Sequence, residues 1–391
     1  MSMSAPEIRP YHLAIPQAAL DDLNDRLART RWPETGPVLD WSYGPPLAYM
    51  RDLVDYWRSG YDWRAAEAKL NALPQFTTEI DRHAVHFIHT HSPEPDAIPL
   101  LLTHGWAGSI LEFTGLLGPL TDPRAHGGDP ADAFHVVIAS PPGFGLSGPT
   151  RDAGWSVKRV ARAWAVLMQR LGYDRYVAHG GDFGSLISRE LGLIDSEHLM
   201  ALNITLLPAY CATYQNIAEL DADDPEVQRS LAASQRYEYE LGGYGAIQGT
   251  RPQLIGYGLN DSPVLQLAWL IDIFRNWTDI TELPEEAIDR DTLLTNAMLY
   301  WLTGTGASSA RYYRDGLETW GEPEEPLAVP MAITVLPRDN FAPVRQLAER
   351  DNAIVRWTEL PRGGHFPGLE VPDLLVDELR ESFRPYRSGR H

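Results

Sequence analysis

The sequence predicts an α/β protein with a mostly parallel central sheet, because apolar segments of strand length alternate with helical segments from residue 74 onward. "IPLLLTHG", "FHVVIASPPG" and "RYVAHGG" are nearly all apolar, as expected for strands that helices cover on both faces. Helical stretches such as "VKRVARAWAVLMQRLG" separate several of these strands. The strand pattern stops near residue 208 and resumes at "MAITVLPRD", so a helical insertion follows the sixth predicted strand.

This pattern divides the chain into four segments. In residues 1–73, stretches such as "PPLAYMRDLVDYWRSGYDW" carry apolar residues at helical spacing, which predicts a helical N-terminal extension. Residues 74–208 form the first part of the α/β core, and residues 326–391 form the second part. Residues 209–325 between them are polar, rich in Tyr and Trp, and without a strand signal, which predicts a helical lid.

Composition excludes several classes of partner. The 391 residues carry a net charge of −20, which disfavours binding to nucleic acid or to an anionic membrane surface. There is no run of about 18 apolar residues that would predict a membrane span. Cys211 is the only cysteine, so no intrachain disulfide is possible, and the N-terminus lacks the pattern of a secretory signal. We therefore expect a cytoplasmic protein that acts on a small molecule.

The segment "HGGDFGS" contains the most informative residue, Asp182. It lies between an apolar strand and a predicted helix, with Gly180 and Gly184 at the two glycine positions of a G-x-S-x-G nucleophile elbow. Aspartate here could simply cap the helix that follows, but a cap does not require glycine on both sides. Glycines at these positions permit a strained, tightly packed turn that exposes the central side chain. Asp182 is therefore predicted to be the nucleophile.

His365 and Asp339 are the predicted partners of Asp182. "RGGHFPGLE" places His365 in a glycine-rich loop after the last strand, and "VLPRDNFAP" places Asp339 directly after the preceding strand. The order nucleophile, acid, histidine is that of the α/β-hydrolase fold, which becomes the predicted fold class. Glu359 is a rival acid, but it lies inside the strand before His365.

Two backbone N–H groups complete the predicted site. In this fold one oxyanion-hole donor comes from the loop after the third strand, here "THGWAGS", and the other from the residue after the nucleophile. These positions are Trp106 and Phe183.

Two other motifs are assigned no ligand. The glycines of "PPGFGLSG" form a G-x-G-x-x-G pattern, but Pro149 disfavours a helix directly after it, and no acidic residue follows about 20 positions on. "HAVHFIHTH" contains four histidines, three of which would share one strand face, yet no carboxylate or cysteine joins them. We expect neither a cofactor nor a metal; the residues concerned are Gly143, Gly145, Gly148, His83, His86, His89 and His91.

Taken together, these motifs resemble those of the microsomal-type epoxide hydrolases over nearly the whole chain. "RTRWPE" and "YWRSGYDWRAAEAKLNALPQFTTEID" are similar to the N-terminal extension of that family, and "HGW", "GGDFGS" and "GGHF" are similar to its core motifs. The resemblance implies two lid tyrosines that polarise the epoxide, Tyr244 in "GGYGAIQG" and Tyr313 in "SARYYRDGL", with Tyr312 as the adjacent rival. One departure is Ala107, where the family usually has a proline that can form a cis peptide bond.

A carboxylate nucleophile suits an epoxide because ring opening is a displacement at an sp³ carbon. A serine would form an ether, which water does not readily cleave, whereas Asp182 forms an ester with a carbonyl that water can attack. The predicted function is therefore hydrolysis of an epoxide to a vicinal diol, with a water activated by His365 and Asp339.

Two alternatives remain open. A haloalkane or haloacid dehalogenase uses the same aspartate but often has a tryptophan after it, where this chain has Phe183. A non-catalytic ligand-binding protein of the same fold is the other. The resemblance further implies an apolar or aromatic epoxide substrate, a homodimer, and similarity to actinobacterial enzymes of natural-product pathways, notably enediyne biosynthesis.

Overall fold

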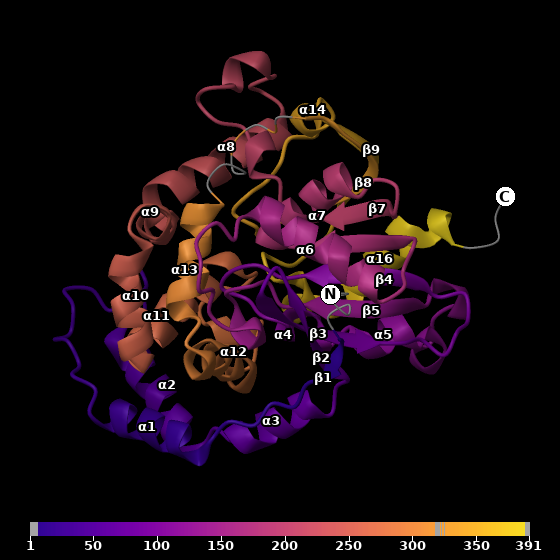
Figure 1. The fold of residues 1–391 in the computed structure, drawn as a ribbon. Helices are drawn as coiled ribbons and strands as arrows, with labels where there is room; N and C mark the ends of the chain where they lie inside the picture. The colour runs from indigo at the N-terminus through magenta and orange to yellow at the C-terminus, as the bar shows by residue number, and fades with distance from the viewer. Residues whose placement is uncertain (1–6, 317–320, 322, 324, 388–391) are drawn as a thin grey trace.

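The computed structural model describes residues 7–316, 321, 323 and 325–387. Within these residues nine strands form one sheet, in the order β1-β2-β3-β5-β4-β6-β7-β8-β9 (Figure 1). Neighbours from β5 to β9 are parallel, whereas β1, β2 and β3 pair in antiparallel fashion with each other and β3 with β5. The strands are β1 Arg9–Pro10, β2 Gln75–Ile80, β3 His83–Thr90, β4 Ile98–Thr103, β5 Phe134–Ala139, β6 Tyr176–Gly180, β7 Leu199–Ile204, β8 Leu327–Val335 and β9 Asn352–Glu359.

Helices cover both faces of the sheet, which confirms the predicted layers. On one face α6 (Val157–Arg170) and α7 (Phe183–Ile194) contact each other, and α7 contacts β4, β6, β7 and β8. On the other face α5 (Leu117–Thr121) contacts β5, and α16 (Pro372–Phe383) contacts β7. Because the strands from β4 to β9 run parallel, their carboxyl ends meet at one edge of the sheet, where α7 begins. Three short helices, α4 Leu111–Thr114, α14 Arg345–Ala348 and α15 Pro367–Glu370, lie in connections.

The lid is helical and lies between β7 and β8, the sixth and seventh predicted strands. In Figure 1 its helices are grouped on the left of the view, beside the sheet. Among the described residues of this segment there is no strand, in agreement with the sequence. The lid helices are α8 Pro225–Arg236, α9 Gly243–Thr250, α10 Pro252–Asp261, α11 Pro263–Trp277, α12 Arg290–Thr303 and α13 Gly306–Asp315, with a π-helical turn at Tyr237–Leu241. The exact domain boundaries stay a prediction.

The N-terminal extension lies along the lower edge of the view in Figure 1 and braces the lid. Its helices are α1 Gln17–Ala28, α2 Leu47–Ser59 and α3 Trp63–Asn71, of which α1 and α2 contact α11. Tyr56 donates a hydrogen bond of 2.7 Å to Asp291 of α12, and Tyr61 lies 2.9 Å from the Thr295 hydroxyl of the same helix. The sequence did not predict β1, because a two-residue strand is too short to show a periodicity.

No helix in the described ranges has the length and apolar character that crossing a bilayer requires.

Candidate active site

Asp182 lies in a strained turn between β6 and α7. Its φ of 51° is in the left-handed region, which is rare for a residue with a side chain. The flanking glycines make this turn possible, because a Cβ on Gly180 would lie 2.1 Å from the backbone of Gly184, and a Cβ on Gly184 would lie 1.8 Å from the carbonyl oxygen of Thr103. The turn therefore has the geometry of a nucleophile elbow, as the sequence indicated.

The loop after β4 holds one oxygen of this carboxylate. The backbone N–H of Trp106 donates to Asp182 Oδ1 at 2.9 Å, and a Cβ on Gly105 would lie 2.1 Å from the same oxygen. Phe183 follows Asp182 as the first residue of α7, where backbone N–H groups point out of the helix end. Trp106 and Phe183 thus occupy the positions that the sequence assigned to oxyanion-hole donors.

The lid helix α12 fixes the conformation of this loop. Asn296 donates to the carbonyl oxygen of Ala107 at 2.8 Å, and Tyr300 donates to that of Gly108 at 2.7 Å. The Trp106–Ala107 peptide bond is cis, so the absence of the usual proline has not removed the cis bond.

His365 joins Asp182 to Asp339. Its Nδ1 lies 3.0 Å from Asp339 Oδ1, and its Nε2 lies 3.3 Å from Asp182 Oδ2. All three side chains are buried. Burial lowers the pKa of His365, but the negative charges of Asp339 and Asp182 outweigh it and raise the pKa to about 10. The two carboxylates therefore stabilise the positively charged form of the imidazole.

The rival acid Glu359 lies elsewhere. It is the last residue of β9, it is half exposed, and it pairs with Arg229 at 3.0 Å. Asp339, in the loop after β8, is the carboxylate that contacts His365.

The loop that carries His365 is connected to the lid by a partly buried carboxyl group. Glu370 accepts backbone hydrogen bonds from Gly364 at 2.9 Å, from Phe366 at 2.8 Å and from Asp279 at 2.7 Å. Burial raises the pKa of Glu370 to about 7, although these three N–H groups act against the rise. Since Asp279 follows α11, Glu370 connects the histidine loop to the lid.

Two lid tyrosines, on α9 and α13, pack against the loop that binds Asp182. The rings of Tyr244 and Tyr313 are 5.7 Å apart, and both pack on Trp106, at 5.1 Å and 5.6 Å between centroids. Their hydroxyl groups interact with each other. Burial raises the pKa of both well above 10, and the charge of Asp182 adds to the rise. Both hydroxyls therefore stay protonated and can donate hydrogen bonds.

The rival tyrosine points into a different environment. Tyr312 packs on Phe144 at 5.3 Å and on Phe183 at 4.7 Å, and its hydroxyl finds no hydrogen-bond partner in the described part of the chain. Successive residues on a helix project about 100° apart, which separates Tyr312 from Tyr313.

Sequence reasoning missed two residues of this region. Tyr237, in the π-helical turn, interacts with the hydroxyl of Tyr244. Glu112 is buried in α4, and burial raises its pKa to about 8 while the charges of His365 and Asp182 also act on it. A carboxylate in the otherwise apolar run "SILEFTGLL" was the sequence signal for Glu112.

The glycine-rich and histidine-rich motifs make contacts within the chain. Ser308 of the lid donates to the carbonyl oxygen of Gly143 at 2.6 Å, and α6 begins only at Val157, well after the glycine-rich loop. His86 binds Ser140 and Gln75, and over the described residues no cluster of His, Cys, Asp or Glu could hold a metal ion.

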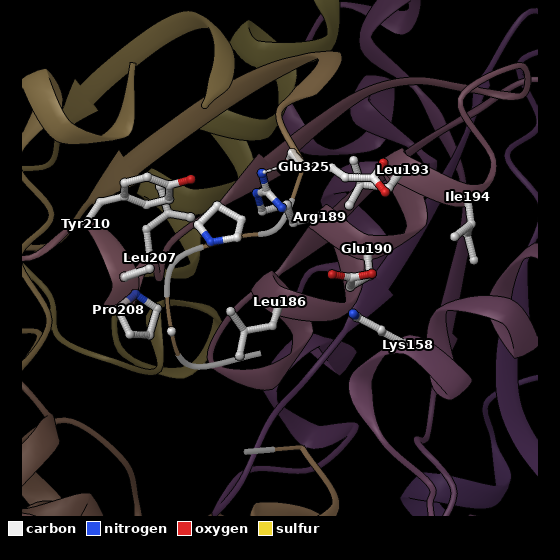
Figure 2. A pocket seen from close by; sticks show the side chains of 13 residues that line it. Lys158, Leu186, Arg189, Glu190, Leu193, Ile194, Leu207, Pro208, Tyr210 and Glu325 are labelled. Atoms are coloured by element: carbon white, nitrogen blue, oxygen red, sulfur yellow. Dashed lines mark hydrogen bonds between the residues drawn. The ribbon is translucent and has the colours of Figure 1, made fainter. Parts of the chain in front are cut away.

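A separate cavity of about 200 Å³ lies along the outer side of α7, and its lining does not include Asp182 (Figure 2). Arg189 points into it but already donates to Asn352 at 2.9 Å and to the carbonyl oxygen of Glu325 at 2.9 Å. The lining of this cavity includes none of Asp182, His365 and Asp339, so it is distinct from the candidate active site.

Comparison with known proteins agrees with this geometry. A family model described as "Epoxide hydrolase N terminus" matches residues 8–113, and one for the α/β hydrolase fold matches residues 98–213. A protein of Stigmatella aurantiaca, provisionally named an epoxide hydrolase, is 45% identical over 97% of this chain and 86% of its own length. Epoxide hydrolase 1 of Sus scrofa is 32% identical over 96% and 88%. The solved structure of the Aspergillus niger epoxide hydrolase has a TM-score of 0.85 at 29% identity and covers 98% of this chain and 97% of its own.

Proposed function

Because the chain belongs to the epoxide hydrolase family, we propose that it opens an epoxide to a vicinal diol through an ester of Asp182. One observation carries the residue assignment: the two oxygens of this carboxylate have different partners. Oδ1 accepts the Trp106 N–H at 2.9 Å, and Oδ2 faces His365 at 3.3 Å. In this proposal the first oxygen becomes the ester carbonyl, and the second attacks a carbon atom of the epoxide.

Ring opening needs a donor for the epoxide oxygen. Asp182 Oδ2 forms a bond to an epoxide carbon, the carbon–oxygen bond of the ring breaks, and the oxygen takes a proton from Tyr244 or Tyr313. The charged His365 is the proton source that restores the tyrosine, directly or through water. Both hydroxyls are buried beside Trp106, so their hydrogen bonds to a developing alkoxide act in a medium of low polarity.

Formation of the ester also prepares His365 for the second step. The ester carries no charge, so one of the two carboxylates that raise the pKa of His365 is removed. Once its proton has gone to the tyrosine, the imidazole stays neutral and can deprotonate water. Asp339, 3.0 Å from Nδ1, orients the ring and stabilises the positive charge that His365 gains when it accepts a proton from water.

The dehalogenase alternative is not favoured. A halide site often uses a tryptophan N–H directly after the nucleophile, and Phe183 offers no side-chain donor there. The relatives and solved structures described above are named as epoxide hydrolases rather than dehalogenases.

The proposal also includes a substrate class, an oligomeric state and a cellular role. Aromatic side chains around Asp182, among them Trp106, Phe183 and Trp277, support an apolar or aromatic epoxide as substrate. Exposed Leu254 and Tyr257 on α10 support a homodimer through the lid. We also keep a cytoplasmic setting and a role in a natural-product pathway as proposals.

Oxygen labelling tests the proposal at the level of the atom. Water attacks the carboxyl carbon of Asp182. In the first turnover, the oxygen added to the epoxide therefore comes from the aspartate and not from water. In a single turnover with excess enzyme in heavy-oxygen water, the diol should be unlabelled and the peptide containing Asp182 should gain the label. Label in the diol at once, with a light peptide, would show direct hydration and refute the ester route. Asp182→Asn is the control and should form neither product.

A further inference from the structure

Two buried polar atoms near Asp182, Glu112 Oε1 and Thr205 Oγ1, have no hydrogen-bond partner among the described residues. The ring nitrogen Nε2 of His365 faces Asp182 Oδ2 at 3.3 Å. Buried polar atoms are usually paired in folded proteins, so two unpaired atoms in one region indicate a shared polar partner.

These atoms converge on one side of the nucleophile. A methyl group placed on Gly181, the neighbour of Asp182, would lie 3.3 Å from Thr205 Oγ1 and 3.5 Å from Glu112 Oε1. The charges of His365 and Asp182 act on Glu112, which places Glu112 within electrostatic range of both. Three different segments meet here, because Glu112 lies on α4, Thr205 follows β7, and His365 follows β9.

The donors and acceptors at this place suit a single water molecule. A buried water usually makes about three hydrogen bonds. The Thr205 hydroxyl can donate or accept, Glu112 offers an acceptor oxygen, and a neutral His365 Nε2 accepts a proton. The face of Gly181 carries no side chain, so nothing from that residue fills the space between them.

We propose that Glu112 and Thr205 hold the water that hydrolyses the ester on Asp182, and so act as positioning residues for the second step. This inference rests on the proposed function. The water oxygen bonds to the carboxyl carbon of Asp182 while a proton passes to His365 Nε2. The charge moves to Oδ1, which the Trp106 N–H binds. The bond to the alkoxy oxygen then breaks, and the diol leaves with the proton from His365.

The charge state of Glu112 fits this role. Burial raises the pKa of Glu112 to about 8, so its carboxyl group is mainly neutral at pH 7. A neutral acid still accepts a hydrogen bond through its carbonyl oxygen, and it adds no second negative charge beside Asp182.

The test separates ring opening from ester hydrolysis. A panel of terminal and aryl epoxides is screened with the wild-type protein, and the fastest substrate is used for rapid-quench intact mass spectrometry. Glu112→Leu and Thr205→Val should slow ester hydrolysis at least about tenfold while ring opening stays within about threefold. Ester-linked protein should therefore accumulate in the steady state. Glu112→Gln, which keeps an acceptor oxygen, should slow hydrolysis less than Glu112→Leu.

Thr121→Val is the matched control, because the Thr121 hydroxyl is buried but bonds to Leu117 within α5, away from the site. It should change neither step. Equal slowing of both steps in Thr205→Val, or unchanged hydrolysis in both Thr205→Val and the Glu112 variants, would overturn the inference. If Glu112→Leu does not fold, the rates of ester hydrolysis in Thr205→Val and Glu112→Gln test the inference. Absence of any ester in the wild-type protein and in His365→Gln would instead refute the proposed function.

Discussion

Replacement of Tyr313 by Phe tests the lid chemistry with the neighbouring tyrosine as its control. The variant removes one hydroxyl beside Asp182 and keeps the ring that packs on Trp106 at 5.6 Å and on Phe183 at 4.9 Å. The contacts of the ring therefore stay almost the same, so a change in the rate of ring opening reports the loss of a hydrogen bond.

The expected magnitude follows from what that hydrogen bond stabilises. A hydrogen bond to a charged group is worth about 1.5–3 kcal/mol. Loss of this stabilisation in the transition state slows ring opening roughly tenfold to a hundredfold. Tyr244 remains as a second donor, so activity should be reduced rather than abolished, and the double replacement should cost more.

The assay is the single-turnover rate of ester formation, measured by quenching and intact mass spectrometry. Tyr312→Phe removes an equally buried hydroxyl from the next residue, whose ring packs on Phe144 and Phe183 instead of Trp106. It should change the rate by less than about threefold. Slowing of Tyr312→Phe with an unaffected Tyr313→Phe would show that the two assignments are reversed.

Three further predictions concern the base, the buried acid and the elbow. His365→Gln should form the ester but not hydrolyse it, so the protein mass should rise by one substrate; an unmodified protein that still binds the epoxide would contradict this. Because burial raises the pKa of Glu112 from about 4.5 to about 8, the folded protein keeps a proton that the unfolded chain releases, and stability falls as pH rises between these values. Glu112→Gln should therefore gain stability over the wild type between pH 5 and 8, by at most about 1.4 kcal/mol per pH unit in denaturant titrations, and a constant difference would refute the shift. Gly184→Ala should destabilise by more than about 3 kcal/mol because its Cβ meets the Thr103 carbonyl, whereas Gly243→Ala, whose Cβ meets nothing within 4 Å, should be neutral; equal melting temperatures would be incompatible with the turn described.

The sequence by itself determined the features that depend on local chemistry. The glycines on both sides of Asp182 predict a tight turn, because a side chain at these positions would clash with the backbone. The apolar strand segments predict a sheet that helices cover on both faces. The helical lid was predictable because its strand signal is absent over a long stretch. These features need only neighbouring residues, so periodicity and turn residues reveal them.

Only the tertiary structure decided which distant side chains meet. The sequence favoured Asp339 over Glu359 as the acid, and the structure shows Asp339 against His365 and Glu359 against Arg229. Tyr313 and Tyr312 are adjacent in the sequence, and the rotation of α13 alone separates their environments. Glu112 belongs to no motif, and its one sequence signal is a carboxylate within an apolar run. Its importance comes from burial beside Asp182, and burial depends on the packing of segments that the sequence shows only one at a time.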